Sequence, residues 1–318
     1  MPTPSPEMVL EAAAALRGAV SRTPVLASPL LDAVAGCRVA AKAESLQLTG
    51  SFKVRGALNR VRSLSEAERA AGLITISAGN AALGAAHAAR EVGAGLTVVM
   101  PEHAVPEKLE AVTALGAHVV KEGVTSSTIA FERAAELQRR EGLTLVHPFD
   151  DPYVIAGAAT ATLELLEDEP GLARLYVPCS GGGLIAGAVL AARAAGSSVE
   201  VIGVQPEGSD GIVRSLAAGE PVAVPAVRTI ADGLTAPRPG VHNLAVLREA
   251  QVRVLLVDDG AILDALRALV TTLRVVLEPS AAAGLAGLLR DEGATGPAGL
   301  LLSGSNVRWQ LLRDVLAA

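Results

Sequence analysis

The amino-acid sequence predicts an α/β fold with mostly parallel, doubly wound sheets. Short apolar runs of strand character alternate with Ala/Leu segments of helical periodicity. Each gap between two runs holds about one helix, which is the pattern of consecutive βαβ units. Hydrophobic residues make up 50% of the chain but aromatic residues only 2%. The core is therefore expected to consist of closely packed Ala, Val and Leu, which suits helices laid on parallel strands.

The expected elements follow one another along the 318 residues. In chain order, the expected strands are residues 37–42, 73–77, 96–100, 118–121, 144–147, 174–178, 199–204, 252–257 and 299–303. The length is about two domains' worth. We expect a larger, discontinuous domain of residues 1–62 plus 149–318, and a smaller α/β domain of residues 63–148 inserted into it. A single helix is expected after Val307, which leaves no room for a C-terminal regulatory domain.

Charge and composition narrow the classes of function. The formal net charge of −6 and the absence of a basic run argue against nucleic acid or an anionic membrane as a partner. No uninterrupted apolar stretch approaches the roughly 18 residues of a spanning helix, and the N-terminus lacks the pattern of a signal peptide. The two cysteines, Cys37 and Cys179, cannot form a disulfide framework. A small-molecule site in a cytoplasmic protein is expected.

Lysine is scarce, so each lysine can be considered individually. The four are Lys42, Lys53, Lys108 and Lys121. Lys53 lies in the segment TGSFKVRGA (49–57), where Gly50 allows a turn and Ser51 is a good N-cap for the helix that follows. In the first helical turn the helix dipole disfavours an ammonium group and lowers its pKa. This setting indicates a nucleophilic lysine; a solvated helix lysine is the alternative. Lys108 is expected in the middle of a helix, and the other two at strand ends.

A glycine-rich loop, SGGGL (180–184), directly follows one expected strand and opens a helix. Successive glycines leave backbone N–H groups uncovered at a helix N-terminus, which is an arrangement that binds phosphate. The loop lacks both the Gly-Lys-Ser/Thr of a P-loop and the spacing of Gly-x-Gly-x-x-Gly, which disfavours a nucleoside triphosphate or a dinucleotide. A plain strand-to-helix turn remains the alternative.

Two further loops carry polar groups at strand ends: SAGN (77–80) and LSGSN (302–306). Ligands bind at this edge of open α/β sheets, although both loops are also acceptable helix caps. A nucleophilic lysine, a phosphate loop and polar strand-end loops together indicate a phosphorylated aldehyde cofactor, and pyridoxal phosphate fits.

Several further strings along the whole chain resemble those of a known family. The strings RTP (22–24), HPFDDP (147–152), IAG (155–157), ADG (231–233) and EPS (278–280) occur in order with SFKVRGA. They are similar to those of the fold-type II pyridoxal-phosphate enzymes, which have the tryptophan synthase β-like fold. The resemblance is strongest to the threonine/serine dehydratase and serine racemase branch.

The resemblance implies roles for specific residues. Lys53 would hold the cofactor covalently and take the Cα proton of the substrate. The other cofactor-binding residues would be Phe52, Asn80 (to the 3-hydroxyl), Ser180, Gly181, Gly182, Gly183, Leu184, Gly233 and Ser303 (to the pyridine nitrogen). The substrate-binding residues would be Ser77, Ala78, Gly79, Asn80, Ala81 and Ala158. The implied enzyme is a dehydratase, or ammonia-lyase, that converts a β-hydroxy-α-amino acid to a 2-oxo acid and ammonia. The resemblance also implies a homodimer.

Departures from the family pattern modify this expectation. Ala81 and Ala158 replace the common His and Gln, which predicts a roomier pocket and a bulkier substrate such as phenylserine. Ala78 stands where racemase relatives have an acid-donating serine, so little racemisation is expected. Gln205 and Gly211 occupy the two acidic positions of the cation-binding members, so no metal is expected. Glu207 and Asp210 lie nearby and are interpreted as solvated loop carboxylates.

Two other functions stay open. The first is β-replacement of the cysteine synthase type, but the SFKVRGA and HPFDDP strings favour the dehydratases. The second is a catalytically silent ligand-binding protein on the same fold, but Lys53 and the phosphate loop argue against it.

Overall fold

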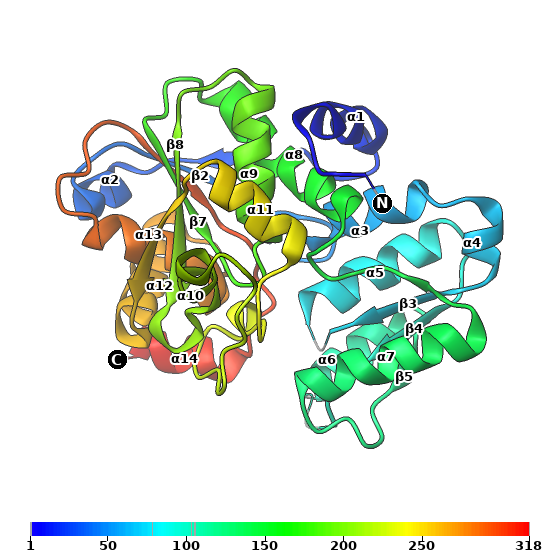
Figure 1. The fold of residues 1–318 in the computed structure, drawn as a ribbon. Coiled ribbons are helices and arrows are strands. Elements are labelled where there is room, and N and C mark those ends of the chain that lie inside the picture. Colours follow the sequence, from blue (N-terminus) through cyan, green and yellow to red (C-terminus); the bar gives the residue numbers. More distant parts are fainter. Residues whose placement is uncertain (1, 78, 103, 105, 318) are drawn as a thin grey trace.

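Two sheets organise the chain (Figure 1). The computed structural model describes residues 2–77, 79–102, 104 and 106–317. Within them, the larger sheet has six strands in the order β1-β2-β10-β7-β8-β9, parallel except for the antiparallel pair β1 and β2. Its strands are β1 (Val25–Leu26), β2 (Val39–Lys42), β7 (Arg174–Pro178), β8 (Glu200–Pro206), β9 (Arg253–Val257) and β10 (Ala298–Leu301).

The smaller sheet lies between β2 and β7 in the chain and is parallel throughout, in the order β5-β4-β3-β6. Its strands are β3 (Leu73–Ile76), β4 (Leu96–Val99), β5 (His118–Val120) and β6 (Thr144–Leu145). Every strand expected from the sequence is present, within a few residues at each end. The two-residue strand β1 was not predicted, because so short a segment carries no periodicity.

Helices cover both faces of each sheet, so the predicted doubly wound α/β fold is confirmed. One face of the larger sheet is covered by α1 (Pro6–Leu16), α8 (Pro152–Asp168), α9 (Gly183–Ala194), α10 (Gly211–Ala218) and α11 (Val241–Glu249). The other face is covered by α2 (Pro29–Ala35), α12 (Asp259–Leu273), α13 (Pro279–Arg290) and α14 (Trp309–Ala317). Around the smaller sheet lie α3 (Lys53–Arg62), α5 (Asn80–Glu91) and α6 (Pro106–Ala114) on one side and α7 (Ser127–Glu141) on the other. The short helix α4 (Glu66–Ala70) precedes β3, and three 3₁₀ turns lie at η1 (Glu44–Leu46), η2 (Glu207–Ser209) and η3 (Asp232–Leu234).

The low aromatic content is explained by how the helices pack. Alanine is the most frequent buried residue in α5, α9 and α13, and such small side chains allow helices to pack closely. Among the helices of the described residues, none is both long and apolar enough to cross a membrane.

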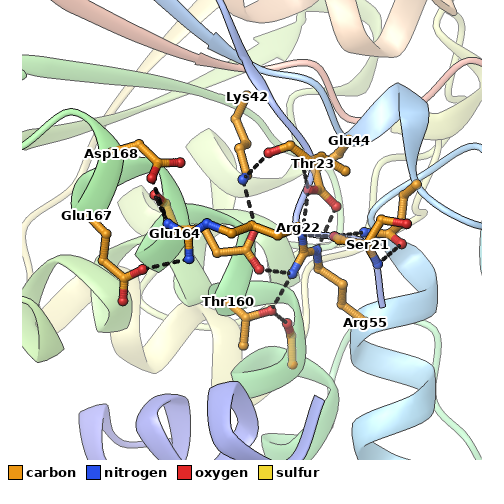
Figure 2. Close-up of polar contacts among 12 residues, drawn as sticks. Ser21, Arg22, Thr23, Lys42, Glu44, Arg55, Thr160, Glu164, Glu167 and Asp168 are labelled. Atoms are coloured by element: carbon orange, nitrogen blue, oxygen red, sulfur yellow. Dashed lines mark hydrogen bonds and ion pairs between the residues drawn. The ribbon is translucent and has the colours of Figure 1, made fainter. Parts of the chain in front are cut away.

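A buried ionic cluster fixes helix α3 to the larger sheet (Figure 2). The fully buried guanidinium of Arg55 pairs with Glu44 and Glu164, each at 2.7 Å. Lys42, also fully buried, pairs with Glu164 at 2.7 Å and donates to the Thr23 carbonyl at 2.6 Å. The positive charges of Arg55 and Lys42 therefore balance the negative charges of Glu44 and Glu164. Burial by itself lowers the pKa of Arg55, but the charge of Glu44 and the carboxylate of Glu164 outweigh it and raise that pKa.

Candidate active site

A cavity of about 400 Å³ lies at the carboxyl ends of strands from both sheets. Loops that follow β3, β7 and β10 contribute to it, together with the N-termini of α3, α5 and α9. Its lining contains Phe52, Lys53, Ser77, Gly79, Asn80, Ala81, Lys108, Pro148, Phe149, Cys179, Ser180, Gly181, Gly182, Gly183, Leu184, Asp232, Gly233, Glu278, Ser280 and Ser303, among others. The structure thus brings together the three polar loops that the sequence analysis selected.

Lys53 is the first residue of α3, and its amine reaches into the cavity. The Nζ donates to the Pro148 carbonyl oxygen at 2.9 Å and lies 5.0 Å from the centre of the Phe52 ring. Burial lowers the pKa of Lys53 to about 8, with the opposing charge of Glu278 limiting the shift.

The prediction that Ser51 caps the N-terminus of this helix is wrong. Phe52 occupies the N-cap position, and the hydroxyl of Ser51 is buried without a hydrogen-bond partner in the described structure. Ser51 instead forms an antiparallel bridge to Gly304, which follows the last strand. This pairing ties Ser51 to the segment after the last strand, and it fixes the start of α3 against the larger sheet.

The lowered pKa of Lys53 predicts how the cofactor-free protein takes up pyridoxal phosphate. Only the neutral amine attacks an aldehyde, so the uptake rate should rise about tenfold per pH unit below pH 8 and level off above it. Stopped-flow absorbance of the mixed protein and cofactor measures this rate between pH 6 and pH 10. A rate that keeps rising to pH 10 would show an amine with an ordinary lysine pKa.

The glycine loop lies against Phe149 and Asn243. Helix α9 begins at Gly183, with Gly182 as its N-cap at φ +95° and no side chain capping the first-turn amides. The Asn243 amide donates to the Phe149 and Gly181 carbonyl oxygens at 3.1 and 2.8 Å. The loop is therefore fixed from behind, and the N-terminal amides of α9 face a cavity that can hold an anion.

Replacing Gly182 with alanine should weaken cofactor binding at least tenfold. A Cβ there lies 2.8 Å from the Asn243 Cβ, and the left-handed backbone disfavours any side chain, so the loop must move. The dissociation constant of pyridoxal phosphate, measured by fluorescence titration, tests this. Gly196→Ala is the matched control, because Gly196 has φ +60° at the other end of α9 and nothing near its Cβ position. Equal affinity losses in the two variants would refute a specific role of the loop.

Polar groups on the opposite side of the cavity form a connected set. Asn80 donates from Nδ2 to Glu278 Oε1 at 2.7 Å and accepts at Oδ1 from Asn306 Nδ2 at 2.7 Å. Ser303 is buried, with its carbonyl oxygen accepting from the Phe52 amide at 3.1 Å, and its side chain lines the cavity. Burial and the charge of Asp232 raise the pKa of Glu278 to about 7, although the Asn80 hydrogen bond and Lys108 oppose the shift.

The loop after β3 contributes backbone and small side chains. Ser77 Oγ accepts from the Gly79 amide at 3.0 Å, and Gly79 is the N-cap of α5, whose first turn has no side-chain cap. Ala81 lines the main cavity, whereas Ala158 lines only a separate void of about 10 Å³ behind Lys53. Ala78, expected in the substrate pocket, lies outside the described residues.

Lys108 is placed differently from the expectation. It lies in the first turn of α6 instead of the middle of a helix, and its ammonium group lines the cavity in an ion pair with Asp232. Gly233, expected at the cofactor, follows Asp232 and donates its amide to Ser280 Oγ at 3.0 Å. The pair joins a helix of the smaller sheet to a loop of the larger one across the cavity.

Sequence reasoning missed several residues that shape the site. Glu278 was noticed only as part of a matching string, and Asn306 only as the end of a polar loop. His147 packs between Phe131 and Phe149 at ring-centre distances of 5.6 and 4.7 Å, and burial lowers its pKa to about 4. The neutral ring accepts the Asp150 amide at 2.8 Å, which shapes the turn that carries the Pro148 carbonyl.

The two loop carboxylates considered for a cation each lie near an arginine. Glu207 is 3.6 Å from Arg290, and Asp210 is 2.6 Å from Arg214. Over the described ranges, no group of three or more potential ligands is arranged for a metal ion.

Comparison with known proteins identifies the family. A family model described as "pyridoxal-phosphate dependent enzyme" matches residues 16–304. The chain belongs to this family. The L-threonine ammonia-lyase of Thermotoga maritima is 38% identical over 311 residues, covering 98% of this chain and 77% of the relative. The L-threo-3-hydroxyaspartate ammonia-lyase of Saccharomyces cerevisiae is 37% identical over 302 residues, covering 94% of this chain and 92% of the relative. Among solved structures, maize serine racemase superposes with a TM-score of 0.93 at 35% identity, covering 99% of this chain and 98% of the racemase.

The residues of this pyridoxal-phosphate dependent enzyme fit its cofactor. The cavity provides one amine with a lowered pKa at Lys53, and uncapped helix amides beside the glycine loop that suit a phosphate. Ser303 lines the same space and offers a hydroxyl group. An aldehyde, a phosphate and a ring nitrogen can each find a suitable group in one cavity.

Proposed function

We propose that this enzyme is an ammonia-lyase that converts a β-hydroxy-α-amino acid to a 2-oxo acid and ammonia. The observation that carries the proposal is the placement of Lys53. Its amine has a lowered pKa and lies in the same cavity as a glycine loop suited to bind an anion. Relatives named threonine and hydroxyaspartate ammonia-lyase support this choice among pyridoxal-phosphate reactions.

Each part of the site has a role in this reaction. When bound, pyridoxal phosphate would supply an electron sink that makes the Cα hydrogen of the amino acid acidic. The Lys53 amine removes that proton, while the N-terminal amides of α9 hold the phosphate. Ser303 offers the ring nitrogen a hydroxyl, which does not force protonation as a carboxylate would. The amides of the Gly79–Ala81 segment bind the α-carboxylate at the N-terminus of α5.

The water balance completes the chemistry. Proton loss at Cα and departure of the β-hydroxyl remove one water molecule from the substrate. Hydrolysis then adds one water molecule, and a 2-oxo acid and ammonium are released.

Racemisation is the main competing activity, because serine racemases are among the similar proteins. It needs an acid on the face of Cα opposite Lys53, and residue 78 is alanine, which has no proton to donate. β-Replacement and silent ligand binding remain further alternatives.

A substrate panel tests the proposed function. Purified enzyme with pyridoxal phosphate is expected to release 2-oxo acid and ammonia in equal amounts from at least one of L-threonine, L-serine, L-threo-3-hydroxyaspartate and phenylserine. When the reaction is run in deuterium oxide, the unreacted amino acid that is recovered should keep its configuration. No inverted amino acid carrying deuterium at Cα should form. Rapid inversion without ammonia would make the enzyme a racemase and overturn the proposal.

The same panel tests the identity of the substrate. Ala81 lines the main cavity with a small side chain, so we propose a preference for a bulky β-substituent, by about 1 to 3 kcal/mol in specificity. Ala81→His should shift the ranking toward threonine and serine. If the natural enzyme strongly prefers threonine or serine and the variant leaves the ranking unchanged, the open-pocket idea is wrong, whereas the lyase assignment stands.

A homodimer and a cytoplasmic location are also part of the proposal. Sedimentation of the purified enzyme measures its assembly directly, and a species of one chain's mass would contradict the dimer.

A further inference from the structure

Three side chains from distant parts of the sequence meet beside the cavity. Asn80 begins α5, Glu278 precedes α13, and Asn306 follows β10. Asn306 Nδ2 donates to Asn80 Oδ1, and Asn80 Nδ2 donates to Glu278 Oε1, both at 2.7 Å. Two of the three, Asn80 and Glu278, line the cavity, and Asn306 lies behind Asn80.

The direction of this hydrogen-bond chain is fixed at one end. Asn306 Nδ2 also donates to the Thr49 carbonyl oxygen at 2.9 Å, and a carbonyl oxygen only accepts. Both hydrogens of the Asn306 amide are therefore used, one of them on Asn80 Oδ1. This assigns the Asn80 oxygen to the Asn306 side and its nitrogen to Glu278, so the orientation of the amide follows from the network itself.

Close packing at Gly304 holds the chain of contacts together. A Cβ on Gly304 would lie 2.6 Å from Glu278 Oε1 and 3.1 Å from Asn80 Nδ2, so no side chain can separate the two. The Gly304 carbonyl oxygen also accepts from the Glu278 amide at 3.1 Å. Glu278 is only 3% exposed, and its carboxylate is committed to Asn80.

We propose that Glu278 and Asn306 are positioning residues that hold the Asn80 amide in one orientation. Asn80 Nδ2 uses one N–H on Glu278 and makes no second hydrogen bond to the described residues, so in this proposal the other N–H serves as a donor to the cavity that Asn80 lines. This inference rests on the proposed function in one respect. The ligand is taken to be pyridoxal phosphate, whose ring hydroxyl would lie near Asn80. An N–H donor favours the ionised form of that hydroxyl, whereas a carbonyl oxygen in its place opposes it. Loss of either partner lets the amide turn and changes the light absorption of the bound cofactor.

A double-mutant cycle tests the role of Asn306. Asn306→Ala, Asn80→Ala and the double variant are loaded with pyridoxal phosphate, and the cofactor's dissociation constant and absorption spectrum are measured. Asn306→Ala alone should weaken binding about tenfold and shift the spectrum. In the Asn80→Ala background the same substitution should change neither, because its effect passes through Asn80. Equal effects in both backgrounds would overturn the proposal.

A conservative pair tests Glu278. Glu278→Gln keeps an acceptor oxygen for Asn80 and should stay within about threefold of the natural affinity, whereas Glu278→Ala should lose about tenfold and shift the spectrum. Equal losses in the two variants would show that Asn80 does not need an acceptor here, and would overturn the role of Glu278.

Ser305→Ala is the matched control. Ser305 lies in the same loop as Asn306 and donates from Oγ to the Ser45 carbonyl oxygen at 2.8 Å, but within the described structure it makes no hydrogen bond to Asn80. It should leave the spectrum unchanged, and a shift equal to that of Asn306→Ala would mean that general loosening of the loop explains both. Since binding and absorption need no turnover, the cycle remains decisive even if the enzyme eliminates none of the tested amino acids.

Discussion

Replacing Lys53 with alanine is expected to reduce turnover by at least about 10³-fold and to abolish the colour of the bound cofactor. The substitution removes the amine that holds the cofactor and the base that takes the Cα proton. Initial rates of 2-oxo acid release and the absorption spectrum of the purified protein measure both effects.

Lys121→Ala is the control for this variant. Lys121 is exposed directly after β5 and lies outside the cavity lining. It should leave rate and colour unchanged. Full activity of Lys53→Ala, or equal losses in the two variants, would contradict the assignment of Lys53.

Replacing Arg55 with methionine should destabilise the protein by about 3 to 5 kcal/mol. The change leaves the two carboxylates of Glu44 and Glu164 with Lys42 alone to balance them, in a largely buried region (Figure 2). Arg55 lies two residues beyond Lys53 on α3, so activity should fall with stability. Urea unfolding of the variant and the natural protein measures the difference in free energy.

Two further variants separate this charge effect from simple loss of packing. Adding Glu44→Gln to Arg55→Met restores one cation to one anion and should recover part of the stability. Arg22→Met is the matched control, since Arg22 is 52% exposed and pairs with Glu167 and Asp168 at 2.9 and 2.6 Å in the same view. It should change stability by less than about 1 kcal/mol. An equal loss in Arg22→Met and Arg55→Met would contradict the account of a buried cluster.

Local patterns were sufficient to predict the strands and the order of the loops, and to single out Lys53, which the structure places in the cavity lining. Strand periodicity needs only neighbouring residues, and parallel strands bring their carboxyl ends to one edge. The glycine loop and the Ser77–Asn80 loop therefore meet in one cavity, as their positions after strands indicated.

The features that sequence reasoning missed depend on contacts between distant segments. Ser51 fails to cap α3 because it pairs with Gly304 from the last strand's loop. Lys108 reaches the cavity because Asp232, 124 residues away, attracts its ammonium group. Glu278 gains its hydrogen bond from Asn80, 198 residues away. No local periodicity records such pairings, although the rarity of lysine was a usable signal for Lys108.

The most direct measurement of the central claim is borohydride reduction of the cofactor-loaded enzyme followed by peptide mass mapping. Reduction fixes the cofactor on the lysine that holds it, and the chain offers four candidates. The account predicts a single pyridoxyl-phosphate adduct on Lys53. An adduct on Lys42, Lys108 or Lys121 in its place, or no adduct on a yellow enzyme, would contradict it.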